Sequence, residues 1–282
     1  DEGTLTAQVA MELICSAPAS TWLEPSSRTT AAISGFPMRP SGQDRATKFE
    51  DINPSGNCGS CSPGSNAYGT DGLYVVGSGG ASPHAYVWNI AQLNSPVDLN
   101  PSGYSDSEAY AVHAGVQVGY AYSSSTRTNH AMLWRGTAAS AVDLTPSTVS
   151  SAYATGLGNS IEVGVGVLVN SSADHAFLWH GTAASLVDLN PAGFTQSVAR
   201  ATRGGIEVGY GYMTGTNALH ALLWKGSARS AVDLEQFVPP TISSSQAYAI
   251  DPKGDIIGAA FSTTTNTWHA VMWVPTALIR RL

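Results

Sequence analysis

The chain has few charged residues, no cluster of basic residues and no long apolar run. Only 12% of its 282 residues are Asp, Glu, Lys or Arg, which is about half the usual share. The net charge is −7, and Lys and Arg are not gathered anywhere beyond the single IRRL at the C-terminus. We therefore expect no nucleic-acid partner, since a phosphate backbone is bound by clustered Lys and Arg. No apolar run is long enough to cross a bilayer, so no membrane-spanning segment is expected.

Cysteine is also scarce. The chain has three cysteines, and two of them, Cys58 and Cys61, form CGSC inside a stretch rich in Gly, Ser and Pro. Three are too few for a disulfide scaffold, so we expect either one local disulfide between Cys58 and Cys61 or two free thiols, with Cys15 left over. A zinc site would need a second pair of ligands nearby, and none is present. The sequence therefore predicts no metal and no cofactor.

In place of charge, the chain uses Ser, Thr, Gly and Asn, a composition typical of secreted or surface proteins built of strands and turns. It opens with DEGTLTAQ, which has neither the basic nor the apolar region of a signal peptide. We expect an exported protein, extracellular or at the cell surface, whose signal peptide has already been removed.

What the chain does contain is a repeat of about 45 residues. The motif HAxxW occurs five times, and successive histidines are 46, 45, 45 and 49 residues apart. Such self-similarity is the signature of a repeat architecture. Each histidine and tryptophan is accompanied by three further markers, a V/I-G glycine, the serine of S-x-A and, in most units, the aspartate of V-D-L. The histidines are His84, His130, His175, His220 and His269, and the tryptophans are Trp88, Trp134, Trp179, Trp224 and Trp273. The glycines are Gly77, Gly119, Gly164, Gly209 and Gly258, the serines Ser65, Ser107, Ser150, Ser197 and Ser245, and the aspartates Asp98, Asp143, Asp188 and Asp233.

Within one unit the apolar period is two. SEAYAV, VQVGYAY, HAMLW and SAVDL are short runs rich in Val, Tyr, Ala and Trp, separated by Gly, Ser, Thr and Asn-Pro turns. This is the signature of strands joined by hairpins. Four strands in 40–45 residues match one blade of a β-propeller. The sequence thus predicts an all-β fold, a five-bladed β-propeller of four-stranded blades.

A surplus aspartate suggests how the ring closes. In the second to fourth units the Asp follows the Trp by nine residues, but nine residues after Trp273 the chain ends at Leu282. Asp51, in KFEDINPSG, has the same context as VDLNPSG at 97–103. We expect the strand around Asp51 to complete the last blade, although TALIRRL could fill that place itself.

The repeated Ser, His, Trp and Asp are interpreted as a structural network. Buried polar groups need hydrogen-bond partners, and a network across neighbouring strands would provide them. The alternatives are five histidines on one metal ion, or five Ser–His–Asp triads. A cleft needs one triad only, so we expect no catalytic residues and no enzyme. The small Ala of HAxxW and the Gly of V-G indicate close approach of backbones.

The repeat resembles the HAF repeat of probable extracellular bacterial proteins. HAFLW at 175–179, DPKGDIIG at 251–258 and the S-x-A, V-G and D-L markers carry the resemblance over about residues 48–282. It implies export and a repeat fold, and no established activity. The Asn-Pro turns depart from the Gly-rich turns frequent in that family, and the first 47 residues have no counterpart in the repeat.

Residues 1–47 are expected to form an arm and a tether, and residues 48–282 the propeller. In TLTAQVAMELI, apolar residues alternate with polar ones as in a half-buried strand, which could add to the edge of its own sheet or of a neighbouring subunit. The arm residues are Leu5, Val9, Met11 and Leu13, with Trp22 in the Pro/Ser/Thr-rich tether as a possible anchor.

Three functions follow from these features. The leading hypothesis is a non-catalytic structural, assembly or interaction module that associates with itself or with another surface protein. The second is a lectin-like carbohydrate binder, in which Trp268, Tyr120, Tyr122, Tyr210 and Tyr212 are candidate sugar platforms, or else core residues. The third is a glycosidase-like enzyme, which needs two converging carboxylates. Its candidates are Asp71, Asp106, Glu108, Asp174, Glu162 and Glu207.

Overall fold

The computed structural model describes residues 50–53 and 64–275. Within them each repeat folds into one antiparallel sheet, and the fold is all-β with short 3-10 turns as its only helices. The expectation of an all-β chain of five sheets is confirmed. No helix in the described ranges is both long and apolar enough to cross a membrane.

Strands follow one another in chain order within each sheet. The first sheet contains β1 (Ser65–Thr70), β2 (Tyr74–Gly79), β3 (His84–Asn89) and β4 (Gln92–Asp98). The second contains β5 (Asp106–His113), β6 (Val116–Ser123), β7 (Thr128–Trp134) and β8 (Val142–Asp143). The third contains β9 (Val149–Gly158), β10 (Ile161–Leu168), β11 (Asp174–Trp179) and β12 (Val187–Asp188). The fourth contains β13 (Phe194–Arg203), β14 (Ile206–Met213), β15 (Leu219–Trp224) and β16 (Val232–Asp233). The fifth contains β17 (Ile242–Ile250), β18 (Ile256–Ser262) and β19 (Thr267–Trp273).

Four 3-10 turns lie just before or after the short fourth strands. They are η1 (Ala138–Ser140), η2 (Ala183–Ser185), η3 (Ala228–Ser230) and η4 (Leu234–Phe237). In the first three, a serine hydroxyl receives the N–H of the residue after the tryptophan, as Ser140 does from Arg135 at 2.7 Å. This bond folds the chain back so that two residues of V-D pair with the third strand.

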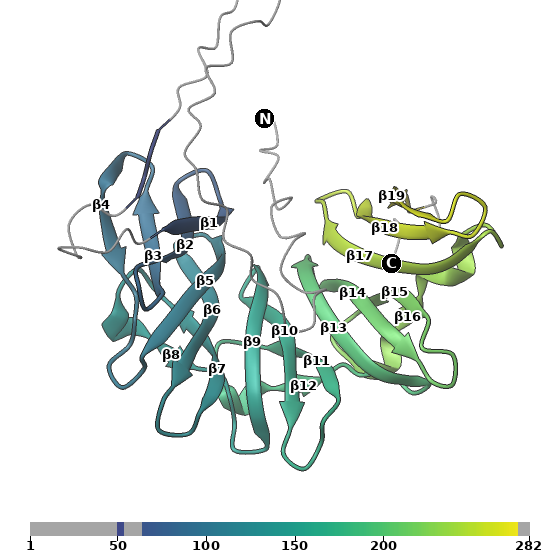
Figure 1. Ribbon diagram of the computed structural model, residues 1–282, viewed down its shortest axis with the longest axis horizontal. Helices are drawn as coiled ribbons and strands as arrows, with labels where there is room; N and C mark the ends of the chain where they lie inside the picture. The colour runs from purple at the N-terminus through teal and green to yellow at the C-terminus, as the bar shows by residue number, and fades with distance from the viewer. Residues whose placement is uncertain (1–49, 54–63, 276–282) are drawn as a thin grey trace, which may run out of the picture.

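The five sheets stand side by side along an arc, and the first and fifth lie at its two ends (Figure 1). The first strand of the first sheet lies toward the inside of the arc, and the fourth lies outside (Figure 1). Apolar clusters fill the joints between neighbouring sheets. Leu99 of the first sheet, for example, lies in one buried cluster with Ala109 and Trp134 of the second. The tryptophans of the first four sheets are fully buried.

A bulge recurs on the first strand of all five sheets, opposite the V-G glycine. In the second sheet Ala109 pairs with Gly119 and Ala111 with Val118, so Tyr110 is the extra residue. A Cβ on Gly119 would lie 1.9 Å from the carbonyl oxygen of Glu108. The other four V-G glycines show the same approach, at 1.8 or 1.9 Å. Only glycine fits there, which explains why the marker is invariant within the chain.

The expected role of the segment around Asp51 as the closing strand of the fifth sheet stays a prediction, because only residues 50–53 of that segment are described. The fifth sheet has three strands in the described part of the chain, and Glu50–Asn53 forms no strand there. The carbonyl oxygen of Ile52 instead accepts a hydrogen bond from Trp88 Nε1 of the first sheet, at 2.7 Å. Residues 276–282, which include most of the alternative TALIRRL strand, lie outside the described residues.

Candidate functional site

The polar centre of each complete sheet is a His–Asp pair. Antiparallel pairing of β7 with β8 sets Met132 opposite Asp143, and this register brings the carboxylate to His130. His130 Nδ1 lies 2.7 Å from Asp143 Oδ2. The other three pairs, at 2.8 Å, are His84 with Asp98, His175 with Asp188 and His220 with Asp233. Both side chains remain partly exposed, to 20% for His130 and 37% for Asp143.

The second oxygen of each aspartate closes a turn. Asp98 Oδ1 accepts the N–H of Asn100 at 2.7 Å, and Asp143 Oδ1 accepts the N–H of Thr145 at 2.8 Å. Asp188 and Asp233 do the same for the residue two positions ahead. Asp51 forms this turn too, with Asn53 N at 3.0 Å. Asp51 thus has the local geometry of the other four aspartates.

The repeated serine joins neighbouring sheets. Ser107 of the second sheet accepts the N–H of Ala85 in the first at 2.9 Å, and its hydroxyl donates to Asn100 Oδ1 at 2.8 Å. Ser197 repeats this with Ala176 and Asn190. Ser245 repeats it with Ala221 and with the carboxylate of Glu235. In these three joints the serine hydroxyl donates to a side chain of the joint and not to a histidine.

The joint between the second and third sheets is built differently. Ala131 donates its N–H to Thr145 Oγ1, at 2.9 Å. The strand register places Ala152, opposite Gly166, where Ser107 lies opposite Ala121 in the second sheet. Ser150, which the letters match to S-x-A, lies two residues earlier and donates to Val167 O. In this joint the hydroxyl that accepts the alanine N–H comes from Thr145 of the preceding sheet, and not from a serine of the following sheet.

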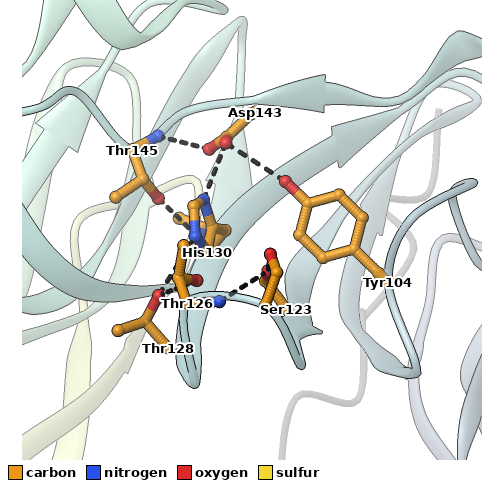
Figure 2. A network of polar contacts seen from close by, with 9 residues as sticks. Tyr104, Ser123, Thr126, Thr128, His130, Asp143 and Thr145 are labelled. Carbon is orange, nitrogen blue, oxygen red and sulfur yellow. Dashed lines mark hydrogen bonds and ion pairs between the residues drawn. The ribbon is translucent and has the colours of Figure 1, made fainter.

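Tyr104 adds a third group to one pair. Its hydroxyl donates to Asp143 Oδ2 at 3.2 Å, and its ring meets His130 edge to face with centroids 5.6 Å apart (Figure 2). Burial, helped by the negative charge of Asp143, raises the pKa of Tyr104 to about 12. On its other side His130 Nε2 lies 3.2 Å from Thr128 Oγ1. Phe194 holds the same place over His220 without a hydroxyl.

The candidate sugar platforms are mostly engaged with other side chains. Tyr120 meets the rings of Tyr110 and Tyr153, with centroids 5.8 and 5.1 Å away, and so connects two sheets. Tyr210 accepts a hydrogen bond from Arg200, which also lies over its ring. Two further platforms, Tyr122 and Tyr212, are half-buried. Trp268 is 48% exposed and meets Phe261 edge to face, so it is the most accessible of the five.

Most of the candidate catalytic carboxylates hold turns or strands together. Glu162 accepts the N–H of Gly181, and Glu207 that of Gly226, each just after a buried tryptophan. Burial raises the pKa of both carboxyls. Asp71 accepts from Leu73 and Tyr74 in its own turn, and Asp106 accepts from Ser105. Burial also raises the pKa of Asp174.

Sequence reasoning missed two groups of residues. Asn100 and Asn190 were interpreted as turn residues only, although their repetition after V-D-L was a usable signal. Glu108 accepts hydrogen bonds from Tyr68 and Tyr110, and burial raises its carboxyl pKa. No repeat marks that cluster. Among the described residues no three His, Cys, Asp or Glu side chains gather as a metal site would require. Leu5, Val9, Met11, Leu13, Trp22, Cys15, Cys58 and Cys61 lie outside the described residues.

Comparisons with known proteins support the fold and go no further. No family model and no curated protein matches the sequence. A solved structure of a putative TolB from Agrobacterium tumefaciens is similar, with a TM-score of 0.50 and 9% identity, over 72% of this chain and 74% of that one. TolB from Acinetobacter baumannii, with a TM-score of 0.42 and 8% identity, matches 71% of this chain and 52% of that one. An endo-arabinase from Bacteroides thetaiotaomicron, with a TM-score of 0.32 and 12% identity, matches 72% of this chain and 89% of that one. The chain has a propeller-type fold, as the first of these likenesses indicates.

Proposed function

We propose that this chain is a non-catalytic, exported interaction module that acts at the cell surface or outside the cell through self-association or a second surface protein. The observation that carries the proposal is the use of the repeated serines. Ser107, Ser197 and Ser245 connect one sheet to the next. A hydroxyl that accepts a backbone N–H and donates to a joint side chain is not poised as a nucleophile, which needs a base beside it.

Low charge and the resemblance to the HAF repeat support export in this proposal. In its full form the propeller has five blades, and the segment around Asp51, of the same copy or of a second one, supplies the aspartate that His269 lacks among the described residues. The Asx turn at Asp51 supports that role, because each of the other four aspartates makes the same turn.

The test is the mass of the chain in solution, measured by light scattering over a range of concentrations. The whole chain is compared with a version lacking residues 1–47, which retains Glu50–Asn53. A whole chain larger than one copy supports an assembly role, and a monomeric truncated version assigns the coupling to the arm. A whole chain that stays monomeric and binds no partner protein contradicts the proposal.

Carbohydrate binding is the second candidate, and the exposure of Trp268 favours it. The exposed ring of Trp268 on β19, beside Phe261 on the neighbouring β18, offers a face on which a sugar can stack. Glycan binding by a monomeric chain, lost in Trp268→Ala and retained in Phe237→Ala, would favour this function. Phe237 is an exposed aromatic on another part of the surface, so it controls for loss of surface apolar area.

A further inference from the structure

The two ends of the arc leave open the surfaces that the inner joints bury. The alanine of the first strand is fully buried in the inner sheets, as at Ala109 and Ala199, but Ala67 of the first sheet is exposed. The alanine of HAxxW is fully buried in the first four sheets, as at Ala221, whereas Ala270 of the fifth is exposed. Each end is therefore half of a joint.

Exposed apolar side chains gather at the same two ends. Nine large apolar residues are exposed in the described part of the chain, and seven of them lie on the first sheet or on the fifth and its end. They are Leu73 and Ile90 in turns of the first sheet, Val97 on β4, and Ile257, Trp268, Met272 and Val274 at the fifth. Such a concentration marks an interaction surface, because scattered single residues would need no explanation.

The polar groups of the two ends are complementary. Strand register makes Ser65 the equivalent of Ser107, and Ala270 the equivalent of Ala85, which donates to Ser107 in the first joint. His269 is the equivalent of the four paired histidines. Asp51, in its Asx turn, carries the carboxylate that such a histidine binds.

Asp51 is already held in the place that a preceding sheet would give it. Each V-D-L leucine lies in a buried cluster with the tryptophan of the following sheet, as Leu99 does with Trp134. Ile52 follows Asp51 as Leu99 follows Asp98, and its carbonyl accepts from Trp88 of the first sheet. The first sheet therefore carries an aspartate ready for a histidine, while β19 lies at the opposite end of the arc (Figure 1).

We propose that the fifth sheet of one copy binds the first sheet and the Asp51 segment of a second copy, head to tail. In that joint Asp51 of one copy pairs with His269 of the other, and Ser65 accepts the N–H of Ala270. The inference rests on the self-association part of the proposed function and names its surface. A joint between different patches of identical chains is heterologous, so it builds a ring or an open filament.

Pairing between cysteine variants tests the joint directly. In the inner sheets the residue before the aspartate pairs with the residue before the tryptophan, as Val142 does with Leu133. The equivalent pair is Glu50 and Met272, and paired residues on adjacent strands are close enough for a disulfide. Cys15, Cys58 and Cys61 are first changed to serine in the full chain. Chains with Glu50→Cys and chains with Met272→Cys carry different tags and are mixed and oxidised.

The expected product is a disulfide-linked pair of differently tagged chains. Val169→Cys replaces Met272→Cys as the control, since Val169 is also exposed and lies in the turn that follows β10 of the third sheet. It should give no such product. Circular dichroism confirms that each variant is folded.

Two results would overturn the inference. One is a mixed product no more abundant with Met272→Cys than with Val169→Cys. The other is a Glu50→Cys/Met272→Cys double variant that links only within its own chain, which would mean that the ring closes in one copy. If light scattering still shows self-association after either result, the proposed function stands, and only the joint between the fifth and first sheets is excluded.

Discussion

Ser107 accepts the backbone N–H of Ala85, a residue of the preceding sheet, at 2.9 Å. Both residues are fully buried, so no solvent can replace the bond. The change Ser107→Ala should therefore lower the free energy of unfolding by about 1–3 kcal/mol, the cost of a buried donor without a partner. Urea denaturation followed by tryptophan fluorescence measures it.

Ser150→Ala is the matched control for that experiment. Ser150 is exposed, and its hydroxyl donates to Val167 O within the third sheet. Its loss should change stability by less than about 0.5 kcal/mol, as for other surface substitutions. If the two changes lower the free energy of unfolding equally, the hydrogen bond across the joint contributes no more to stability than the bond of a surface serine.

Alanine at Gly119 should prevent stable folding. The new Cβ would lie 1.9 Å from the carbonyl oxygen of Glu108, and a strand carbonyl cannot move away without breaking the ladder. We expect a loss of more than about 4 kcal/mol, the range of severe single substitutions. Thermal unfolding by circular dichroism measures the change. Gly64→Ala is the control, since nothing lies within 4 Å of its Cβ position.

Glu207→Gln should make the protein more stable at neutral pH. Glu207 is fully buried and accepts the N–H of Gly226, and burial raises its carboxyl pKa. A raised pKa means that the folded state favours the neutral acid. The stabilisation that the neutral carboxyl provides is therefore present below its ordinary pKa of 4.5 and is lost as the pH rises through its pKa in the folded state. Glutamine keeps an oxygen for Gly226 without the charge.

Gln117 shows that the substitution is compatible with the site. In the second sheet Gln117 Oε1 accepts the N–H of Gly136 at 2.8 Å, as the glutamates do elsewhere. The stability gain of Glu207→Gln should shrink as pH falls through the carboxyl's pKa, and Gln117→Glu should show the opposite pH dependence. Urea denaturation at a series of pH values, from below the ordinary carboxyl pKa of 4.5 up to neutral pH, checks both. A gain that is constant with pH would exclude the desolvation argument.

The joint between the second and third sheets should accept the serine–asparagine pair of the first and third joints only when both of its sides change. Thr145→Asn removes the hydroxyl that Ala131 uses, and Ala152→Ser alone crowds a second hydroxyl against it. Together they recreate the Ser–Asn arrangement of Ser107 and Asn100. A double-mutant cycle should give a favourable coupling of order 1 kcal/mol. Simple additivity of the two changes would argue against compensation.

The repeat predicted the five sheets and, in the first four of them, the four strands of each. Period-two runs and Gly or Asn-Pro turns are local signals, and β5 to β8 follow them closely. The glycine of V-G and the alanine of HAxxW also lie where close approach was expected, at Gly119 and Ala131. These positions depend on backbone geometry within one unit, and a sequence shows that geometry directly.

The joints were less predictable, because they depend on the register between strands. Ser150 matches S-x-A by its letters, yet Ala152 occupies the equivalent place. The role of Asn100 depends on a serine seven residues later in the next sheet. The placement of Ile52 on Trp88 joins residues 36 positions apart. Such partners depend on three-dimensional packing. The repetition of asparagine after V-D-L marks a position of interest, but it does not show which residue will be its partner.

The bulge on the first strand is fixed in position while its extra residue varies. That residue is a tyrosine in the first, second and fifth sheets, Thr155 in the third and Arg200 in the fourth. The backbone distortion needs a glycine opposite it and no particular side chain at the bulge, so each unit makes its own contact from that position. Thr155 donates to Ala199 O of the next sheet, whereas Arg200 donates to Tyr210 of its own sheet. This chain therefore separates the letters that build its architecture from one position per unit whose letter is matched to its own neighbours.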